Sequence, residues 1–132
     1  MSSPLKGIKI LDLTHMLAGP YGTMVLADLG AEIIKIEPPL KGEITRNLLK
    51  NDPDYSVDGV GAYHLTLGRN KKSLTLDLKS EPGKNIFYQL VKKVDVVIDN
   101  FSSGVTKRLK IDHETIKTVS YTHLTLPTKR IV

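Results

Sequence analysis

The chain has 132 residues, 40% of them hydrophobic and 25% charged, with a formal net charge of +5. This composition is typical of one globular domain or of part of a larger one. Zero cysteines exclude disulfides and a Cys-based zinc site, and they are compatible with a cytoplasmic protein. No apolar run reaches the roughly 18 residues of a membrane span, and basic residues are mixed with acidic ones, so we expect neither a membrane nor a nucleic-acid partner.

The first third of the chain predicts a strand, a helix and a second strand. Residues 8–13 ("IKILDL") form a short apolar run, typical of a strand that is buried on both faces. A helix follows, in which Pro20 fits the first position and Gly30 the position just past the end. Residues 31–37 ("AEIIKIE") predict the second strand. Strand, helix and strand in this order indicate a βαβ unit with parallel strands.

The inner face of this first helix is predicted from the spacing of its apolar residues. Val25, Leu26 and Leu29 recur at helical intervals, so we expect them to form a buried stripe. Gly22 is interpreted as a site of close packing between helix and strand.

The glycine turn before the helix also resembles a dinucleotide-binding loop. Glu37, at the end of the second strand, would then bind a ribose. The G-x-G-x-x-G pattern is absent, however, because only Gly19 and Gly22 are present and Pro20 lies between them. The evidence for NAD is therefore weak, but ligands of open parallel sheets still bind at the carboxyl ends of strands.

The middle of the chain is less regular. Residues 38–60 are rich in Pro and Gly and predict a long loop. Residues 61–68 ("GAYHLTLG") fit either a helical turn or a strand. Residues 73–79 ("SLTLDLK") alternate between polar and apolar side chains and predict a strand.

A second helix is predicted to begin at Ser80, a good N-cap, with Pro82 in its first turn. A buried strand at 94–100 and a polar helix at 104–118 follow. The order of elements predicts an α/β fold with an open, mostly parallel sheet and flanking helices. The residues expected to pack on one side of the second helix are Ile86, Phe87, Leu90, Val91 and Val94.

Two further segments carry polar groups suited to a ligand. "GRNKKS", 68–73, could grip phosphates or could be a solvated basic turn. "DNFSSG", 99–104, could hold and cover a planar ring or could be a turn with a core aromatic. His15, His64 and Asp12 are expected to be structural, because no catalytic set or metal-ligand spacing is visible.

The end of the chain does not continue this pattern. Residues 119–132 ("VSYTHLTLPTKRIV") fit an edge strand interrupted by Pro127, or a non-native tail. Ten consecutive residues from Val119 can be read back into a DNA sequence similar to a sequencing-library adapter. We therefore expect a non-native tail over residues 119–132.

Three stretches together resemble, in order and spacing, the family III CoA-transferases, the CaiB/BaiF group. They are "LKGIKILDLTHMLAGPYGTMVLADLGAEIIKIEPP", "GRNKKSLTLDLKS" and "VDVVIDNFSSGVTKRL". The family contains formyl-CoA transferase, carnitine CoA-transferase and, as a relative, α-methylacyl-CoA racemase. The resemblance implies that residues 1–118 are the N-terminal part of a Rossmann-like, CoA-binding large domain. It also implies a homodimer whose two chains interlock.

The resemblance implies CoA contacts on several segments. Leu17 stands where formyl-CoA transferase has Gln, which argues against formyl or oxalyl specificity. Pro38 replaces an arginine that meets the nucleotide end of CoA, so the phosphates would be met by Lys41, Lys71 or Lys72. The implied CoA-binding positions are His15, Met16, Leu17, Ala18, Leu76, Asp77, Leu78, Lys79, Asn100, Phe101, Ser102 and Arg108.

The activity implied by the resemblance moves CoA between an acyl-CoA thioester and a carboxylic acid. A family aspartate attacks the thioester, which gives a mixed anhydride and CoA thiolate, and the reaction passes through aspartyl-CoA. This aspartate lies beyond Thr118 in the family, so no catalytic residue is assigned here and the chain alone is expected to be inactive. CoA is a substrate, and neither a metal nor a permanently bound cofactor is implied.

Two other functions stay open. The first is an acyl-CoA racemase of the same superfamily, which moves an α-proton with residues that also lie further along. The second is a dinucleotide-dependent oxidoreductase domain, for which Glu37 and the glycine turn are the evidence.

Overall fold

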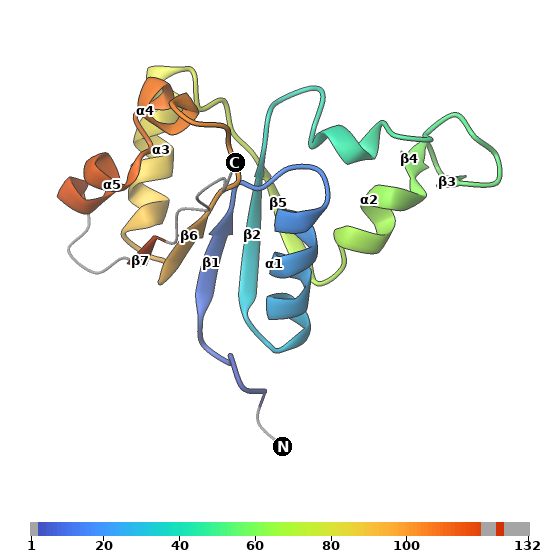
Figure 1. The fold of residues 1–132 in the computed structure, drawn as a ribbon, viewed down its shortest axis with the longest axis horizontal. Coiled ribbons are helices and arrows are strands. Elements are labelled where there is room, and N and C mark those ends of the chain that lie inside the picture. The colour runs from blue at the N-terminus through green and yellow to red at the C-terminus, as the bar shows by residue number, and fades with distance from the viewer. Residues whose placement is uncertain (1–2, 120–123, 126–132) are drawn as a thin grey trace.

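The apolar runs of the sequence form the strands of one parallel sheet (Figure 1). The computed structural model describes residues 3–119 and 124–125. The main elements are β1 (Lys9–Asp12), α1 (Ala18–Asp28), β2 (Glu32–Glu37), β5 (Lys71–Thr75), α3 (Glu81–Val91), β6 (Val96–Ile98), α4 (Val105–Leu109), α5 (His113–Val119) and β7 (Leu124–Thr125). Between β2 and β5 lie η1 (Ile44–Arg46), β3 (Ser56–Val57), β4 (Val60–Gly61) and α2 (Ala62–Leu67).

The sheet has the order β5-β2-β1-β6-β7, and each neighbouring pair is parallel. Counted along the chain, this is the 3-2-1-4-5 order of doubly wound α/β folds. From β1, successive strands are added on one side as β2 and β5, and then on the other side as β6 and β7. The strand order therefore reverses between β1 and β6. The predicted α/β class with an open parallel sheet is confirmed, and the crevice beside β1 and β6 is where such sheets bind ligands.

Helices cover both faces of the sheet, with α1 beside β2 and with α3, α4 and α5 grouped on the other side (Figure 1). Alternate residues of β1 therefore enter different cores. Leu11 packs with Phe87 and Val91 of α3, whereas Ile10 packs with Ala27 of α1. Burial on both faces explains why the strands read as continuous apolar runs.

The predicted buried stripe of α1 is wrong. Val25 and Leu29 are 37% and 41% exposed, and Leu26 is only partly buried. The inner face instead carries Thr23 and Met24, together with Pro20 and Ala27. Thr23 faces inward because its hydroxyl donates a hydrogen bond to a buried carboxylate at the end of β1. The hydrogen bond that Thr23 makes to Asp12, and not the spacing of the apolar residues, therefore sets which face of α1 is buried.

The residues at the two ends of α1 are partly as predicted. Gly30 follows the last helical residues with a φ of +101°, a left-handed conformation that favours glycine. Pro20, in contrast, is the third residue of the helix rather than the first. Gly22 is exposed and has no atom within 4 Å of a hypothetical Cβ, so its predicted packing role is wrong.

The strand predicted at 73–79 begins and ends earlier, at Lys71 and Thr75. Asp77 accepts a hydrogen bond from the amide of Lys79 and one from the hydroxyl of Ser80, which makes a turn in place of the last strand residues. The helix predicted at 104–118 is two short helices, α4 and α5, separated near Lys110 at a φ of +57°.

The second helix is close to the prediction. The hydroxyl of Ser80 accepts a hydrogen bond from the amide of Gly83 at 3.1 Å, which confirms the N-cap. Phe87 and Val91 are fully buried, but Ile86 is 46% exposed, so its assignment to the packed side is wrong.

The ambiguous segment 61–68 forms α2 after the short β3–β4 hairpin. Within the described residues, no helix is long and apolar enough to cross a membrane. The prediction of a non-native tail at 119–132 lies largely outside the described residues. Within it, only the end of α5 and the pairing of β7 with β6 are described.

Candidate functional site

A pocket opens at the carboxyl ends of the strands, at the predicted edge of the sheet. Its volume of about 170 Å³ is below the roughly 300–1,000 Å³ of typical small-molecule sites. Most of the lining is apolar. The lining residues are Leu13, His15, Ile36, Glu37, Pro38, Leu76, Asp77, Leu78, Lys79, Phe101 and Leu109.

Six of the twelve implied CoA-binding positions meet in this pocket: His15, Leu76, Asp77, Leu78, Lys79 and Phe101. They come from three segments that are far apart in the chain. The pocket also includes apolar residues that the sequence analysis did not assign, such as Leu13, Ile36 and Leu109. Their only signal in the sequence is their place at or near the end of a predicted element.

The other implied positions lie around the pocket rather than in its lining. Asn100 is joined to His15 by hydrogen bonds. Met16 and Leu17 are 47% and 53% exposed in the loop between β1 and α1. Ala18, Ser102 and Arg108 are exposed, and Arg108 precedes a lining residue of α4. Contacts of these residues with CoA stay a prediction.

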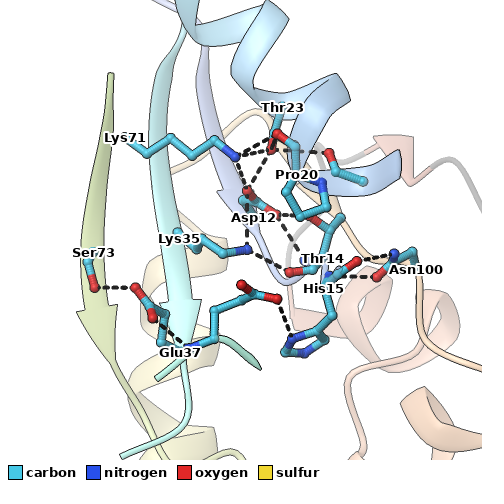
Figure 2. A network of polar contacts seen from close by, with 12 residues as sticks. Asp12, Thr14, His15, Pro20, Thr23, Lys35, Glu37, Lys71, Ser73 and Asn100 are labelled. Carbon is cyan, nitrogen blue, oxygen red and sulfur yellow. Dashed lines mark hydrogen bonds and ion pairs between the residues drawn. The ribbon is translucent and has the colours of Figure 1, made fainter. Parts of the chain in front are cut away.

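His15 is held at the rim by the segment after β6 (Figure 2). Its amide donates to Oδ1 of Asn100 at 2.8 Å, and its carbonyl accepts from Nδ2 of Asn100 at 2.8 Å. The imidazole lies 5.2 Å from the ring of Phe101. Burial, together with the positive charge of Lys35, lowers the pKa of His15 below its ordinary value. His15 is therefore neutral at pH 7, able to donate from one ring nitrogen and accept on the other.

A buried polar network supports the loop that carries His15 (Figure 2). Oδ1 of Asp12 accepts from the amide and the hydroxyl of Thr14, at 2.9 and 2.5 Å. Its Oδ2 accepts from the Thr23 hydroxyl at 2.6 Å and from Nζ of Lys71 at 3.2 Å. Nζ of Lys35 lies 3.6 Å from the same oxygen and donates to the Thr14 carbonyl at 2.6 Å. The expected structural role of Asp12 is confirmed.

Lys71 and Lys72 do not face the pocket, so their predicted role as phosphate contacts is wrong. The Lys71 side chain is 2% exposed, and its Nζ donates to Asp12, the Thr23 hydroxyl and the Pro20 carbonyl. Lys72 pairs with Glu32 at 2.9 Å at the amino end of the sheet. Lys72 therefore lies at the edge opposite the pocket, whereas the Lys71 ammonium is engaged in the buried network around Asp12.

Lys41 is exposed in the turn after β2, which is the correct edge, and its contact with phosphate stays a prediction.

Glu37 is engaged within the protein and is not free for a ribose. Its carboxylate accepts two hydrogen bonds from Arg46 at 2.6 and 2.7 Å, one from Ser73 at 2.6 Å and one from the Glu43 amide at 2.7 Å. Burial opposes ionisation, but these donors outweigh it and lower the pKa of Glu37 to about 2. The main residue evidence for a dinucleotide is therefore removed.

A second buried carboxylate, Glu43, lies beside His64. Nδ1 of His64 is 3.7 Å from Oε2 of Glu43 and 3.3 Å from the hydroxyl of Thr45. These contacts confirm a structural role for His64. Among the described residues, no group of three or more His, Asp or Glu side chains is arranged to hold a metal ion.

The sequence analysis did not find this polar network as a unit. Its signal was present in the strand "EIIKIE", because Lys35 and Glu37 interrupt a run that is buried on both faces. Charged side chains in such a strand require buried partners of opposite charge.

Known proteins are similar to this chain in sequence and in fold. The sequence profile of CoA-transferase family III matches residues 5–121. A formyl-CoA:oxalate CoA-transferase from Bradyrhizobium sp. (strain ORS 278) is 42% identical over 120 residues, which are 91% of this chain and 27% of that protein. An acetyl-CoA:oxalate CoA-transferase from Acetobacter aceti is 41% identical over 117 residues, 89% of this chain and 29% of that protein.

A crystal structure of a CaiB/BaiF family protein from Brucella suis superimposes with a TM-score of 0.81 and 36% identity. The match covers 91% of this chain and 32% of that one. This chain thus spans about 27% of the length of the first curated relative. Because the family profile matches residues 5–121, the chain belongs to CoA-transferase family III.

Proposed function

We propose that residues 1–118 are the N-terminal, CoA-binding part of an enzyme that moves CoA between an acyl-CoA thioester and a carboxylic acid. One observation carries the proposal. Residues after β1, β5 and β6 line one pocket at the edge where the strand order reverses. Ligands of open α/β sheets bind at this edge. The family membership of the chain supports CoA as the ligand.

The pocket has the chemistry for an uncharged part of CoA. Leu76, Leu78 and Leu109 supply apolar walls, and the rings of His15 and Phe101 lie at its rim. A planar or alkyl group fits such a lining, while Lys79 offers a positive charge at the same opening. We assign the pocket to CoA itself and leave the acyl group unassigned.

The acids used by the parent enzyme are left open for a specific reason. The relatives are named for formyl-CoA, acetyl-CoA and oxalate, which favours a small carboxylic acid as acceptor. Leu17, in place of the Gln that the resemblance implies, argues against formyl or oxalyl groups. CoA is the common substrate whether or not the acyl group is formyl or oxalyl, so we propose CoA as the ligand and leave the acid open.

The proposed reaction uses an aspartate that this chain does not contain. That carboxylate attacks the thioester carbon and expels CoA as the thiolate, which leaves a mixed anhydride. The thiolate then attacks the aspartyl carbonyl of the anhydride, which releases the donor's carboxylate and gives aspartyl-CoA. The acceptor carboxylate repeats these steps in reverse and leaves as its own CoA thioester, which restores the aspartate. The proposed parent is a homodimer with interlocked chains. We expect no acyl exchange by the 132-residue chain, and measurable exchange would contradict the assignment of the nucleophile to the missing part.

An acyl-CoA racemase of the same superfamily would use the same CoA pocket, so it is the second candidate for the parent. An oxidoreductase with a dinucleotide is less well supported, because Glu37 is bound by Arg46 and Ser73.

Calorimetric titration of the chain with CoA and with NAD⁺ tests the proposal. We expect CoA to bind and NAD⁺ not to bind, and NAD⁺ binding without CoA binding would overturn it. Phe101→Ala is expected to weaken CoA binding about tenfold, because the partly buried ring that lines the pocket is lost. Tyr55→Ala, which removes an exposed aromatic outside the pocket lining, is the matched control and is expected to bind as the wild type does.

A further inference from the structure

Glu43 is a buried carboxylate that does not line the pocket and does not lie in the sheet. Its side chain is 1% exposed, although it lies in the turn after β2. Burial opposes its ionisation, but contacts with His64 and with the amides of Met16 and Thr45 outweigh this and lower its pKa. It is therefore a buried anion at neutral pH.

The two oxygens of Glu43 serve different segments. Oε2 accepts from the amide of Thr45 at 2.9 Å and from its hydroxyl, and so caps η1 within the same turn. Oε1 leaves the turn and accepts from the amide of Met16 at 3.0 Å. It also lies 3.9 Å from Nδ1 of His15. One oxygen is local, and the other reaches the loop between β1 and α1.

The residue that Oε1 holds has an unusual backbone. Met16 has a φ of +67°, in the left-handed region that residues other than glycine rarely adopt. Its side chain is 47% exposed, so packing of that side chain does not explain the conformation. The hydrogen bond from its amide to Glu43 does explain it, because a charged acceptor binds an amide more strongly than a neutral one does.

Glu43 is itself fixed from the other side. Its amide donates to Glu37 at 2.7 Å, and Glu37 is held by Ser73 of β5 and by Arg46. Polar contacts thus run from β5 through β2 to the loop after β1. On the far side of that loop, Asn100 holds His15. The loop is clamped between two anchors.

We propose that Glu43 is a positioning residue for the CoA site: it holds Met16 in the left-handed conformation and places a negative charge 3.9 Å from Nδ1 of His15. With Nδ1 directed to Glu43, Nε2 is the ring nitrogen left for CoA. This role rests on the proposed function, since the loop it positions is the one assigned to CoA.

The test separates the two oxygens. Glu43→Ser keeps a good N-cap for η1 but cannot reach Met16. Without Glu43, the backbone of Met16 is expected to leave the left-handed conformation. Binding of CoA must then restore this conformation, so we expect an affinity about tenfold weaker. Thr45→Val is the control, since it removes the hydroxyl that contacts Oε2 and His64 but leaves the contact between Oε1 and the Met16 amide in place. It is expected to change CoA affinity by less than about threefold.

A second variant tests the mechanism rather than the position. Glycine adopts a positive φ without steric cost, so Met16→Gly should reduce the effect of Glu43→Ser well below tenfold. A merely structural role for Glu43 predicts the same loss in both backgrounds and would overturn the proposal.

The possible failures are distinguishable. If the wild type binds CoA and Glu43→Ser binds it equally well, the positioning role is wrong and the proposed function stands. If the wild type binds no CoA, both fall. If the Glu43→Ser chain does not fold, amide hydrogen exchange in the wild type decides, because the proposal requires a protected Met16 amide and rapid exchange there would overturn it.

Discussion

Asp12 is the residue on which most buried charge in the described part of the chain converges. One carboxylate, fully buried, faces the ammonium groups of Lys35 and Lys71 and two threonine hydroxyls. Burial alone would raise the pKa of Asp12, but the two lysines and the hydroxyls outweigh it and the pKa lies below its ordinary value. The network ties β1, β2, β5 and α1 together beside the loop between β1 and α1.

Replacement of Asp12 by Asn leaves both lysines buried without their counter-charge. We expect a loss of about 3–5 kcal/mol in the free energy of unfolding, measured by urea denaturation at pH 7. Asp28→Asn is the matched control, since Asp28 pairs with Arg69 in an exposed position. Its effect is expected to be much smaller. Equal losses in the two variants would contradict the assignment of the network to the core.

Glu37 predicts how stability depends on pH. Its folded pKa of about 2 lies below its ordinary value of 4.5. The ionised form therefore stabilises the fold above about pH 4.5, and this stabilisation, on the order of 3 kcal/mol, is lost as pH falls through about 2. Urea denaturation from pH 6 to pH 2.5 should show a shallower loss in Glu37→Gln than in the wild type. Parallel curves would show that Glu37 is not the titrating group.

At the scale of elements, α1 closely approaches the loop after β1 at one glycine and not at the other. A Cβ on Gly19 would lie 2.3 Å from Cβ of Thr14, whereas Gly22 faces open space. The close approach lets Thr14 reach Asp12 while α1 begins beside it. The helix needs a glycine at position 19 for packing, and its glycine at 22 has no such reason.

The two glycines give opposite predictions for the same substitution. Gly19→Ala should destabilise the chain by about 1–3 kcal/mol, because the helix must move away from the loop. Gly22→Ala should stabilise it by up to about 1 kcal/mol, because alanine is the better helix former. Thermal unfolding of both variants measures this. A loss in Gly22→Ala as large as in Gly19→Ala would contradict the packing described.

The elements show what a sequence pattern can and cannot predict. Strands β1 and β2 and the end of α1 at Gly30 followed from local composition, because burial on two faces and a left-handed C-cap have local causes. The inner face of α1 did not, because Thr23 is buried to serve a carboxylate on another element. The end of β5 did not either, since the apolar alternation continues into Leu76 and Leu78, which line the pocket.

At the scale of the whole molecule, the position of the site depends on the direction of the strands. The six positions that meet in the pocket all follow the carboxyl ends of β1, β5 and β6. Lys71 and Lys72 precede Ser73, the first residue of the predicted strand, so they fall at its amino end. Charge and spacing alone favoured them as phosphate contacts, whereas the direction of the strand argues against Lys72 and the buried contacts with Asp12 argue against Lys71.

The central claim is that CoA binds at this pocket, and mapping of amide NMR shifts during CoA titration tests it most directly. We expect the largest shifts at residues 13–17, 76–79 and 100–102, with little change at residues 69–72, at the start of β5 and just before it. Shifts centred on residues 69–72, or no shifts at saturating CoA, would contradict the account.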